Sequence, residues 1–237
     1  IERIPEIIHR AFNVAMSGRK GPVVVALPEE VVFGQTEHVE ALPAACAAQP
    51  AADTAALEAL HAALKQAQRP MVIVGGTGWT QQARADLTAF VERYHLPVAA
   101  GFRRQDIFDN RHPQYIGMLG LSISPALVNT VKEADLLIVL GSRMSETTST
   151  DYQLIRSPKP LQKLVHVHAQ PEEINRVFHC DIGIACSMPQ IAKALASLPG
   201  PQPTPQWASW TAQARINYQV HNTPIPRHAQ LQGVDMG

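Results

Sequence analysis

Neither sign of charge dominates this 237-residue chain, in which twenty Lys and Arg residues balance twenty Asp and Glu residues. No stretch is rich in Lys or Arg, so the electrostatic footprint of a nucleic-acid-binding protein is missing. The apolar stretches are short and are interrupted by proline, glycine or charge, so none is long enough to span a bilayer. With 46% apolar residues, the composition instead indicates a globular protein with a buried core and no nucleic-acid or membrane partner.

Cysteine is scarce as well. The three cysteines, Cys46, Cys180 and Cys186, are odd in number and show no Cys-x-x-Cys spacing. This pattern favours reduced thiols over disulfides or metal ligands. The opening segment IERIPEIIHR carries charges among its apolar positions, unlike a secretory signal. We therefore expect a cytoplasmic protein, and the missing initiator methionine leads us to expect a piece of a longer one.

The first residues have the pattern of one helix followed by one strand. Apolar residues recur at helical spacing from Ile4 to Met16. The segment PVVVALP at Pro22–Pro28 is a continuous apolar stretch of the length of a buried strand. This order predicts the end of an α/β domain over residues 1–35, followed by a linker over residues 36–52.

Residues 53–199 alternate between helical and strand patterns. Asp53 is well placed to cap the first of these helices, because its carboxylate can accept free amide hydrogens. Such alternation predicts a Rossmann-like α/β domain, a doubly wound parallel sheet covered on both faces. Residues 101–121 have the composition of a long loop, and residues 200–237 that of a proline-rich linker and a Trp-bearing helix leading to another domain. Helices are expected near residues 53–68, 80–94, 125–133, 171–178 and 188–198, and strands near 70–74, 97–100, 135–141, 163–169 and 181–187.

Glycine-containing turns follow two of the predicted strands. In VGGTG at Val74–Gly78, glycines would let the backbone approach a phosphate, although the dinucleotide-binding fingerprint is incomplete because its third glycine falls on Gln81. A tight turn without a ligand is the alternative. In GSR at Gly141–Arg143, the arginine suits a phosphate or carboxylate, or a simple ion pair with Glu146. Because carboxyl ends of parallel strands meet at one edge, the two turns predict a ligand crevice.

Two histidines, His166 and His168, alternate along a predicted strand and so face the same side of the sheet. Without a third ligand nearby they are poor evidence for zinc, and we expect them to be ordinary core residues. No GxSxG motif occurs, so a hydrolase nucleophile elbow is not supported.

Several segments together resemble the acetolactate synthase–pyruvate oxidase group of thiamine-diphosphate enzymes. GRKGPVVVALPEEV is similar to the end of that family's pyrimidine-binding domain, and RPMVIVGGTG to the first strand and turn of its central domain. HPQYIGMLG, ADLLIVLGSR, KLVHVHAQPEEI and finally GVDMG, which resembles the entry to the diphosphate-binding domain, follow in the family's order. The order and spacing make the resemblance specific, and it covers essentially the whole chain.

This resemblance implies the non-catalytic central domain of an enzyme that decarboxylates or joins 2-oxo acids. In that family, thiamine diphosphate and Mg²⁺ lie between the pyrimidine-binding and diphosphate-binding domains of homodimers or homotetramers. The catalytic glutamate of the first and the GDG…N motif of the second have no counterpart in these 237 residues. We therefore expect no catalytic residue, no metal ligand and no activity from the chain alone, and expect those two domains as its partners.

In the central domain, some family members hold FAD, others ADP and others nothing. The acidic positions of FAD-binding synthases are replaced here by His168 and Gln170, and their Gly-Asp pair by Cys186-Ser187, while Ser145 and Thr147 replace charged positions after the arginine. These departures favour a degenerate or empty crevice over FAD. The resemblance carries the nucleotide-binding positions over to Gly75, Gly76, Thr77, Gly101, Phe102, Arg103, Leu119, Gly120, Gly141, Ser142 and Arg143.

Two other functions are compatible with the pattern. One is a free-standing nucleotide-binding module that uses the glycine turn and Arg143. The other is a purely structural domain whose crevice is empty. The helix and strand expected at residues 1–35 count against a free-standing module, because they would expose an apolar edge unless neighbouring parts cover it.

Overall fold

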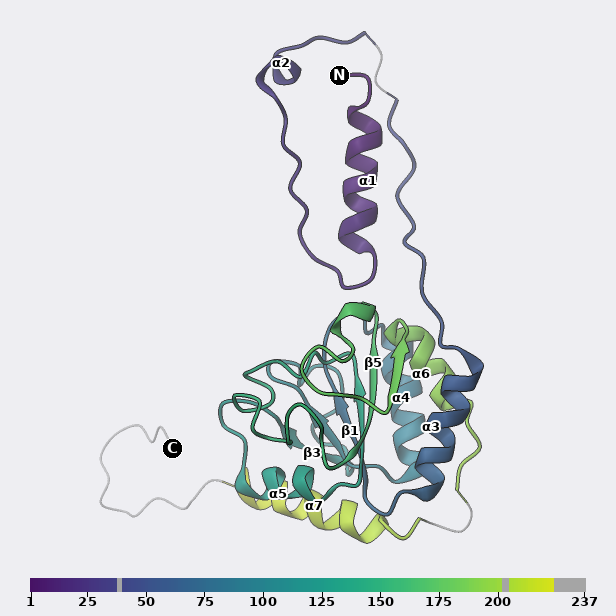
Figure 1. Cartoon of the computed structure of the whole chain (residues 1–237), viewed down its shortest axis with the longest axis vertical. Helices are drawn as coiled ribbons and strands as arrows, with labels where there is room; N and C mark the ends of the chain where they lie inside the picture. The colour runs from purple at the N-terminus through teal and green to yellow at the C-terminus, as the bar shows by residue number, and fades with distance from the viewer. Residues whose placement is uncertain (38–39, 202–204, 224–237) are drawn as a thin grey trace, which may run out of the picture.

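A computed structural model describes residues 1–37, 40–201 and 205–223 of the chain. Its centre is a six-stranded parallel sheet with the strand order β3-β2-β1-β4-β5-β6 (Figure 1). This arrangement confirms the predicted doubly wound α/β class. The strands are β1 (Pro70–Val74), β2 (Val98–Ala100), β3 (Tyr115–Met118), β4 (Leu136–Leu140), β5 (Lys163–His168) and β6 (Ile182–Ala185).

Helices cover both faces of the sheet. Successive residues of β1 point to opposite sides, so that Val72 and Val74 enter one apolar core and Met71 and Ile73 enter the other. Both cores are fully shielded from solvent along β1 and β4, as expected for a parallel sheet between two helical layers. The first core is covered by α3 (Thr54–Gln66), α4 (Gln81–Tyr94) and α6 (Met188–Ala196), and the second by α5 (Pro125–Glu133) and α7 (Ala208–His221).

Side-chain caps explain where three of these helices begin. Asp53, Thr80 and Ser124 each accept the backbone N–H of the residue three positions later, at the starts of α3, α4 and α5. In α5, Pro125 occupies the first turn, where its missing N–H has no intrahelical partner to lose. These helices lie within two residues of their predicted bounds because cap and apolar stripe agree.

Two predicted elements are wrong. Pro22–Pro28 forms no strand, and the side chain of Val24 in its middle is 92% exposed. An apolar stretch becomes a strand only beside a hydrogen-bonded neighbour, and the described residues provide none there. The helix predicted at residues 171–178 is reduced to the short 3-10 turn η1 (Pro171–Glu173), because Asn175 takes a left-handed conformation with φ of 62°.

One strand was also missed. The stretch predicted as a loop over residues 101–121 contains β3, which pairs with β2 through an irregular register between Val98 and Ala99. The proline and glycines around β3 hid its strand character.

The C-terminal helix α7 is tied to the sheet domain by side chains. Trp207 donates its indole N–H to the carbonyl of Tyr94 at 2.8 Å, and Arg215 donates to the carbonyls of Asn110 and Tyr115 at 2.9 and 2.8 Å. The helix therefore completes the second core rather than standing free. The GVDMG segment expected to lead into another domain lies outside the described residues.

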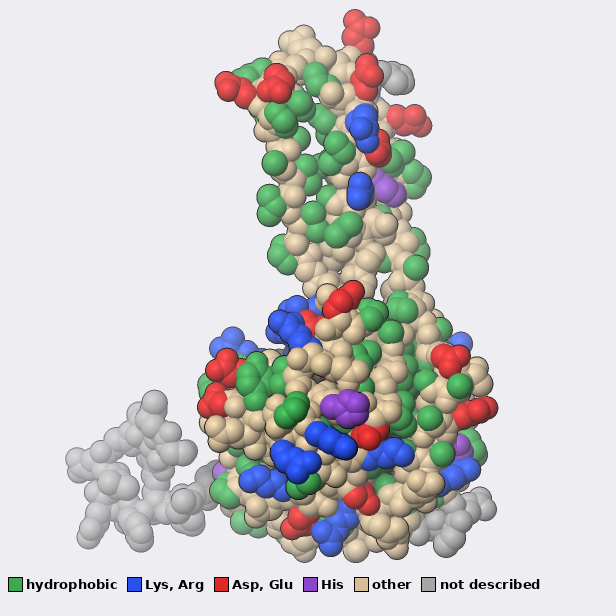
Figure 2. Space-filling view, viewed as in Figure 1, with side chains coloured by type: hydrophobic (Ala, Val, Ile, Leu, Met, Phe, Trp, Pro, Cys, Tyr) green, Lys and Arg blue, Asp and Glu red, His purple; other side chains and the backbone are tan. Residues whose placement is uncertain are grey.

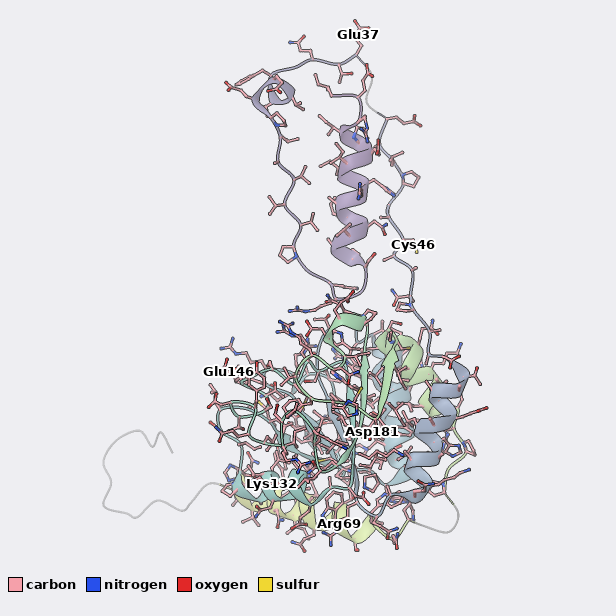
Figure 3. The ribbon with its side chains drawn as sticks, viewed as in Figure 1. Glu37, Cys46, Arg69, Lys132, Glu146 and Asp181 are labelled. Atoms are coloured by element: carbon pink, nitrogen blue, oxygen red, sulfur yellow. The ribbon has the colours of Figure 1, made fainter. Side chains whose placement is uncertain are left out.

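Residues 1–35 stand apart from the sheet domain (Figure 1). They form α1 (Ile4–Met16), which buries none of its residues, and the single turn α2 (Glu29–Val32), with extended chain between them. The linker then runs alongside α1, with Cys46 exposed on it (Figure 3), and reaches the start of α6. No described helix is both long enough and apolar enough to cross a membrane.

Candidate functional site: a crevice at the strand ends

A cleft of about 220 Å³ opens at the carboxyl ends of β1, β2, β4 and β5. The strand order reverses here, because the chain leaves β1 for β2 on one side while β4 pairs with β1 on the other. Open parallel sheets bind ligands at this position. The structure brings eight of the eleven expected residues together in the cleft: Gly75, Gly76, Thr77, Gly101, Phe102, Gly141, Ser142 and Arg143.

The glycine turn after β1 packs directly on the turn after β4. Gly76 has a φ of 69°, and a Cβ atom at this position would overlap the carbonyl oxygen of Gly141. Trp79 closes the turn by donating its indole N–H to the carbonyl of Gly75 at 2.8 Å. Contact between the two turns is enough to require these glycines. The evidence for a ligand therefore has to come from the polar groups around the cleft.

Three expected residues support the wall of the cleft without lining it. Arg103 turns away with a φ of 59°, and its guanidinium carbon lies 5.0 Å from the centre of the Phe102 ring. Leu119 is fully buried, and its N–H donates to the carbonyl of Ala100 at 2.8 Å. Gly120 packs against Phe102, since a Cβ atom there would lie 2.8 Å from that ring.

Several lining residues were not expected from the sequence. Arg104 takes the place of Arg103 in the cleft, because the left-handed backbone of Arg103 reverses their directions. Gly18 and Arg19 come from the N-terminal segment, and nothing in their local sequence signals that this turn reaches the sheet domain. The remaining unexpected members are Ser145, Thr148, His168, Ala169 and Met188.

Positive charge dominates the mouth of the cleft, where Arg19, Arg104 and Arg143 meet. Arg104 is paired with Asp106, with its Nε atom 3.1 Å from the carboxylate oxygen Oδ1. The partner of Arg143 is Glu173 rather than the Glu146 considered from the sequence, which lies at the outer edge of the domain (Figure 3).

Glu173 is the acidic centre of this cluster, and its side chain is only 4% exposed. Arg176 donates from Nη1 to both carboxylate oxygens at 3.0 Å. Arg19 and Arg143 approach the same carboxylate less closely, with Nη1–Oε1 distances of 3.7 and 4.0 Å. One carboxylate thus faces three guanidinium groups, and the two that line the cleft keep donors for an anion.

The two histidines of β5 support the turn after β4 from behind. His166 donates from Nε2 to the carbonyl of Ser142 at 2.8 Å, and burial lowers the pKa of its imidazole. His168 lines the cleft, and burial lowers its pKa as well. Both rings are therefore neutral at neutral pH. Over the described ranges, no three or more His, Cys, Asp or Glu side chains converge where they could hold a metal ion.

The end of the cleft nearest β6 is closed. Ser187, which precedes α6, gives its backbone N–H to the carbonyl of Pro50 in the linker at 2.9 Å. Its hydroxyl oxygen is buried without a hydrogen-bond partner. Burial also raises the pKa of the neighbouring Cys186 thiol to about 11, so this thiol is protonated and unreactive.

Comparison with known proteins agrees with this architecture. The family model described as "Thiamine pyrophosphate enzyme, central domain" matches residues 57–195, which is more than half of the chain. The chain is 28% identical over 229 residues to the acetolactate synthase isozyme 1 large subunit of Escherichia coli K12, covering 96% of this chain and 39% of that protein.

Two further relatives come from distant organisms. The chain is 31% identical over 184 residues to the acetolactate synthase large subunit of Parasynechococcus marenigrum, covering 75% of this chain and 29% of that protein. It is 30% identical over 190 residues to the probable acetolactate synthase large subunit of Methanocaldococcus jannaschii, covering 77% and 32%. The chain thus spans two fifths or less of the length of these three relatives. With its sheet order and the family match over residues 57–195, the chain belongs to the thiamine pyrophosphate enzymes and carries their central domain.

Proposed function

We propose that this chain is the non-catalytic central part of a thiamine-diphosphate-dependent enzyme that decarboxylates or joins 2-oxo acids. The observation that carries the proposal is the family match over residues 57–195, which falls on a complete doubly wound sheet. Similarity to an acetolactate synthase large subunit over 96% of the chain supports the reaction class.

The domain's own task in this proposal is assembly. Residues 1–35 would be the end of the pyrimidine-binding domain, residues 36–52 a linker, residues 53–199 the central domain, and residues 200–237 the approach to the diphosphate-binding domain. Thiamine diphosphate, when bound with Mg²⁺, supplies the carbanion chemistry. The residues of this chain hold the two cofactor-binding domains in place, in a cytoplasmic homodimer or homotetramer.

An assay on the full reading frame tests this function. The protein encoded by that frame is incubated with pyruvate, and consumption is expected only when thiamine diphosphate and Mg²⁺ are both added. The 237-residue chain alone is expected to consume none. Consumption by the chain alone, or consumption without thiamine diphosphate, would contradict the proposal.

A second role, binding of an accessory nucleotide, is favoured by the charge of the cleft. Arg19 and Arg143 share one carboxylate with Arg176, which leaves donors for the phosphates of ADP or a related ligand. The turns at residues 75–77, 101–102 and 141–143 would lie beside those phosphates.

Calorimetric titration with ADP tests this second role. Arg143→Gln should weaken binding by about tenfold or more, because a hydrogen bond to a charged group is lost. Arg156→Gln, at an exposed arginine outside the cleft, is the matched control and should leave the affinity unchanged. Equal losses in both variants would argue against binding in the crevice.

A further inference from the structure

We propose that the crevice accepts a nucleoside diphosphate and excludes a dinucleotide such as FAD, with Met188 as the specificity-determining residue that sets this limit. The inference rests on the nucleotide-binding role proposed above and adds the size of the ligand. It follows from how the two ends of the cleft are closed.

The volume of the cleft is the first observation. At about 220 Å³, it falls below the roughly 300–1,000 Å³ typical of sites that enclose drug-sized ligands. Its lining is confined to the ends of β1, β2, β4 and β5 and to the turn at Gly18 and Arg19. This space suits the phosphate-bearing end of a ligand, with the remainder outside.

On the β6 side, Met188 occupies the path along the strand ends. Its side chain is 2% exposed and lines the cleft. A Cβ atom on Gly141 would lie 2.8 Å from the Met188 sulfur, so the thioether rests on the turn after β4. A ligand that extended toward β6 would have to displace this side chain.

The start of α6 behind Met188 offers few donors to such a ligand. Helix N-termini commonly bind anions through free backbone N–H groups. Here the N–H of Ser187 is already bonded to Pro50, and Pro189 has no N–H. The acceptor is a carbonyl of the linker, so the linker and Met188 close this end together.

The opposite end is closed by aromatic packing. Phe102 lines the cleft, and its ring lies against Gly120 after β3. Leu119 behind it is fully buried. A ligand therefore cannot extend past β2, and the space between Phe102 and Met188 is the length available.

Titrations with ADP and with FAD test the limit. The wild-type chain should bind ADP about tenfold or more tightly than FAD, because FAD must push aside packed side chains. Met188→Ala should strengthen FAD binding and reduce that preference about fivefold or more. Met118→Ala removes a methionine outside the lining and should leave the preference unchanged.

The outcomes separate the two proposals. Equal affinities for ADP and FAD in the wild type would overturn the size limit and leave the nucleotide role standing, and an unchanged preference in Met188→Ala would overturn the part assigned to Met188. No binding of either ligand to the wild type would overturn the nucleotide role and the size limit with it. If Met188→Ala unfolds, Met188→Val opens less space and should shift the preference in the same direction.

Discussion

Gly76 shows how a single residue is fixed by its surroundings. Its φ of 69° is unfavourable for any residue with a Cβ atom, and that atom would overlap the carbonyl oxygen of Gly141. Gly76→Ala should therefore lower the free energy of unfolding by about 2–5 kcal/mol, combining backbone strain with overpacking. Urea denaturation followed by circular dichroism measures the change.

The control for this change is Gly78, two residues later in the same turn. It also has a positive φ, 86°, but a Cβ atom there would meet nothing within 4 Å. Gly78→Ala should cost only the strain, about 1–2 kcal/mol. Equal losses in the two variants would show that the contact between the turns after β1 and β4 is unimportant for stability.

His166 makes stability depend on pH. Burial lowers its pKa in the folded chain below the ordinary value of 6.5, so below pH 6.5 the unfolded chain takes up a proton that the folded chain refuses. Stability should be full above pH 6.5 and fall as the pH drops toward the folded pKa. Denaturation series from about pH 8 to about pH 5 should show this decline.

Replacing the imidazole isolates its contribution. In His166→Gln, the amide can still donate to the carbonyl of Ser142 but does not titrate, so the decline below pH 6.5 should become shallower. His221→Gln, at the exposed end of α7, should leave the decline unchanged. Identical pH profiles for wild type and His166→Gln would rule out this role.

Residue-scale prediction from sequence succeeded where a strand end fixed the position. Gly75, Gly101 and Gly141 follow β1, β2 and β4 directly, so their meeting at one edge followed from the fold class. Arg103 was wrong as a lining residue and Arg104 was missed, because the backbone conformation that exchanges them has no sequence signature at non-glycine residues. Arg19 could not be found because tertiary contact alone brings its segment to the cleft.

At the scale of elements, α5 and α6 offer a matched pair of helix starts. Ser124 caps α5 by accepting the N–H of Leu127 at 3.1 Å, whereas Ser187 precedes α6 and makes no capping bond. Ser124→Ala should cost about 1 kcal/mol of stability. Ser187→Ala should be neutral or stabilising, because it removes a buried hydroxyl that has no partner. Urea denaturation of both variants checks this, and equal losses would contradict it.

The elements differed in how far sequence could predict them. The helix α5 was found at its observed bounds because cap, proline and apolar stripe agree there. For Pro22–Pro28, β propensity was high but no pairing partner lies beside the segment among the described residues. At residues 171–178, the acidic and apolar spacing suited a helix, yet the chain turns at Asn175, whose side-chain oxygen accepts the N–H of Cys180 at 2.8 Å.

At the scale of the whole molecule, the N-terminal segment presents an unusual apolar surface (Figure 2). Phe12 and Phe33 are 64% and 77% exposed. Exposed apolar surface of this kind promotes association, so the chain should self-associate as its concentration rises. Light scattering over a concentration series should show a growing mean mass.

Substitutions link that association to its surface. The double variant Phe12→Gln, Phe33→Gln should reduce the concentration dependence of the mean mass. The matched variant Leu121→Gln, Leu161→Gln changes two equally exposed apolar residues of the sheet domain and should not. A monodisperse monomer of the wild-type chain at high concentration would refute the prediction.

The position of β1 in the middle of the sheet also has a consequence for the ribosome-bound chain. β2 emerges soon after β1 and can pair with one edge, but the other edge needs β4, where Leu136 lies opposite Pro70. Until β4 has been synthesised, the most apolar strand of the domain keeps an open hydrogen-bonding edge, which is a template for aggregation. Nascent chains halted between β2 and β4 should therefore be the form of this protein that most depends on chaperones.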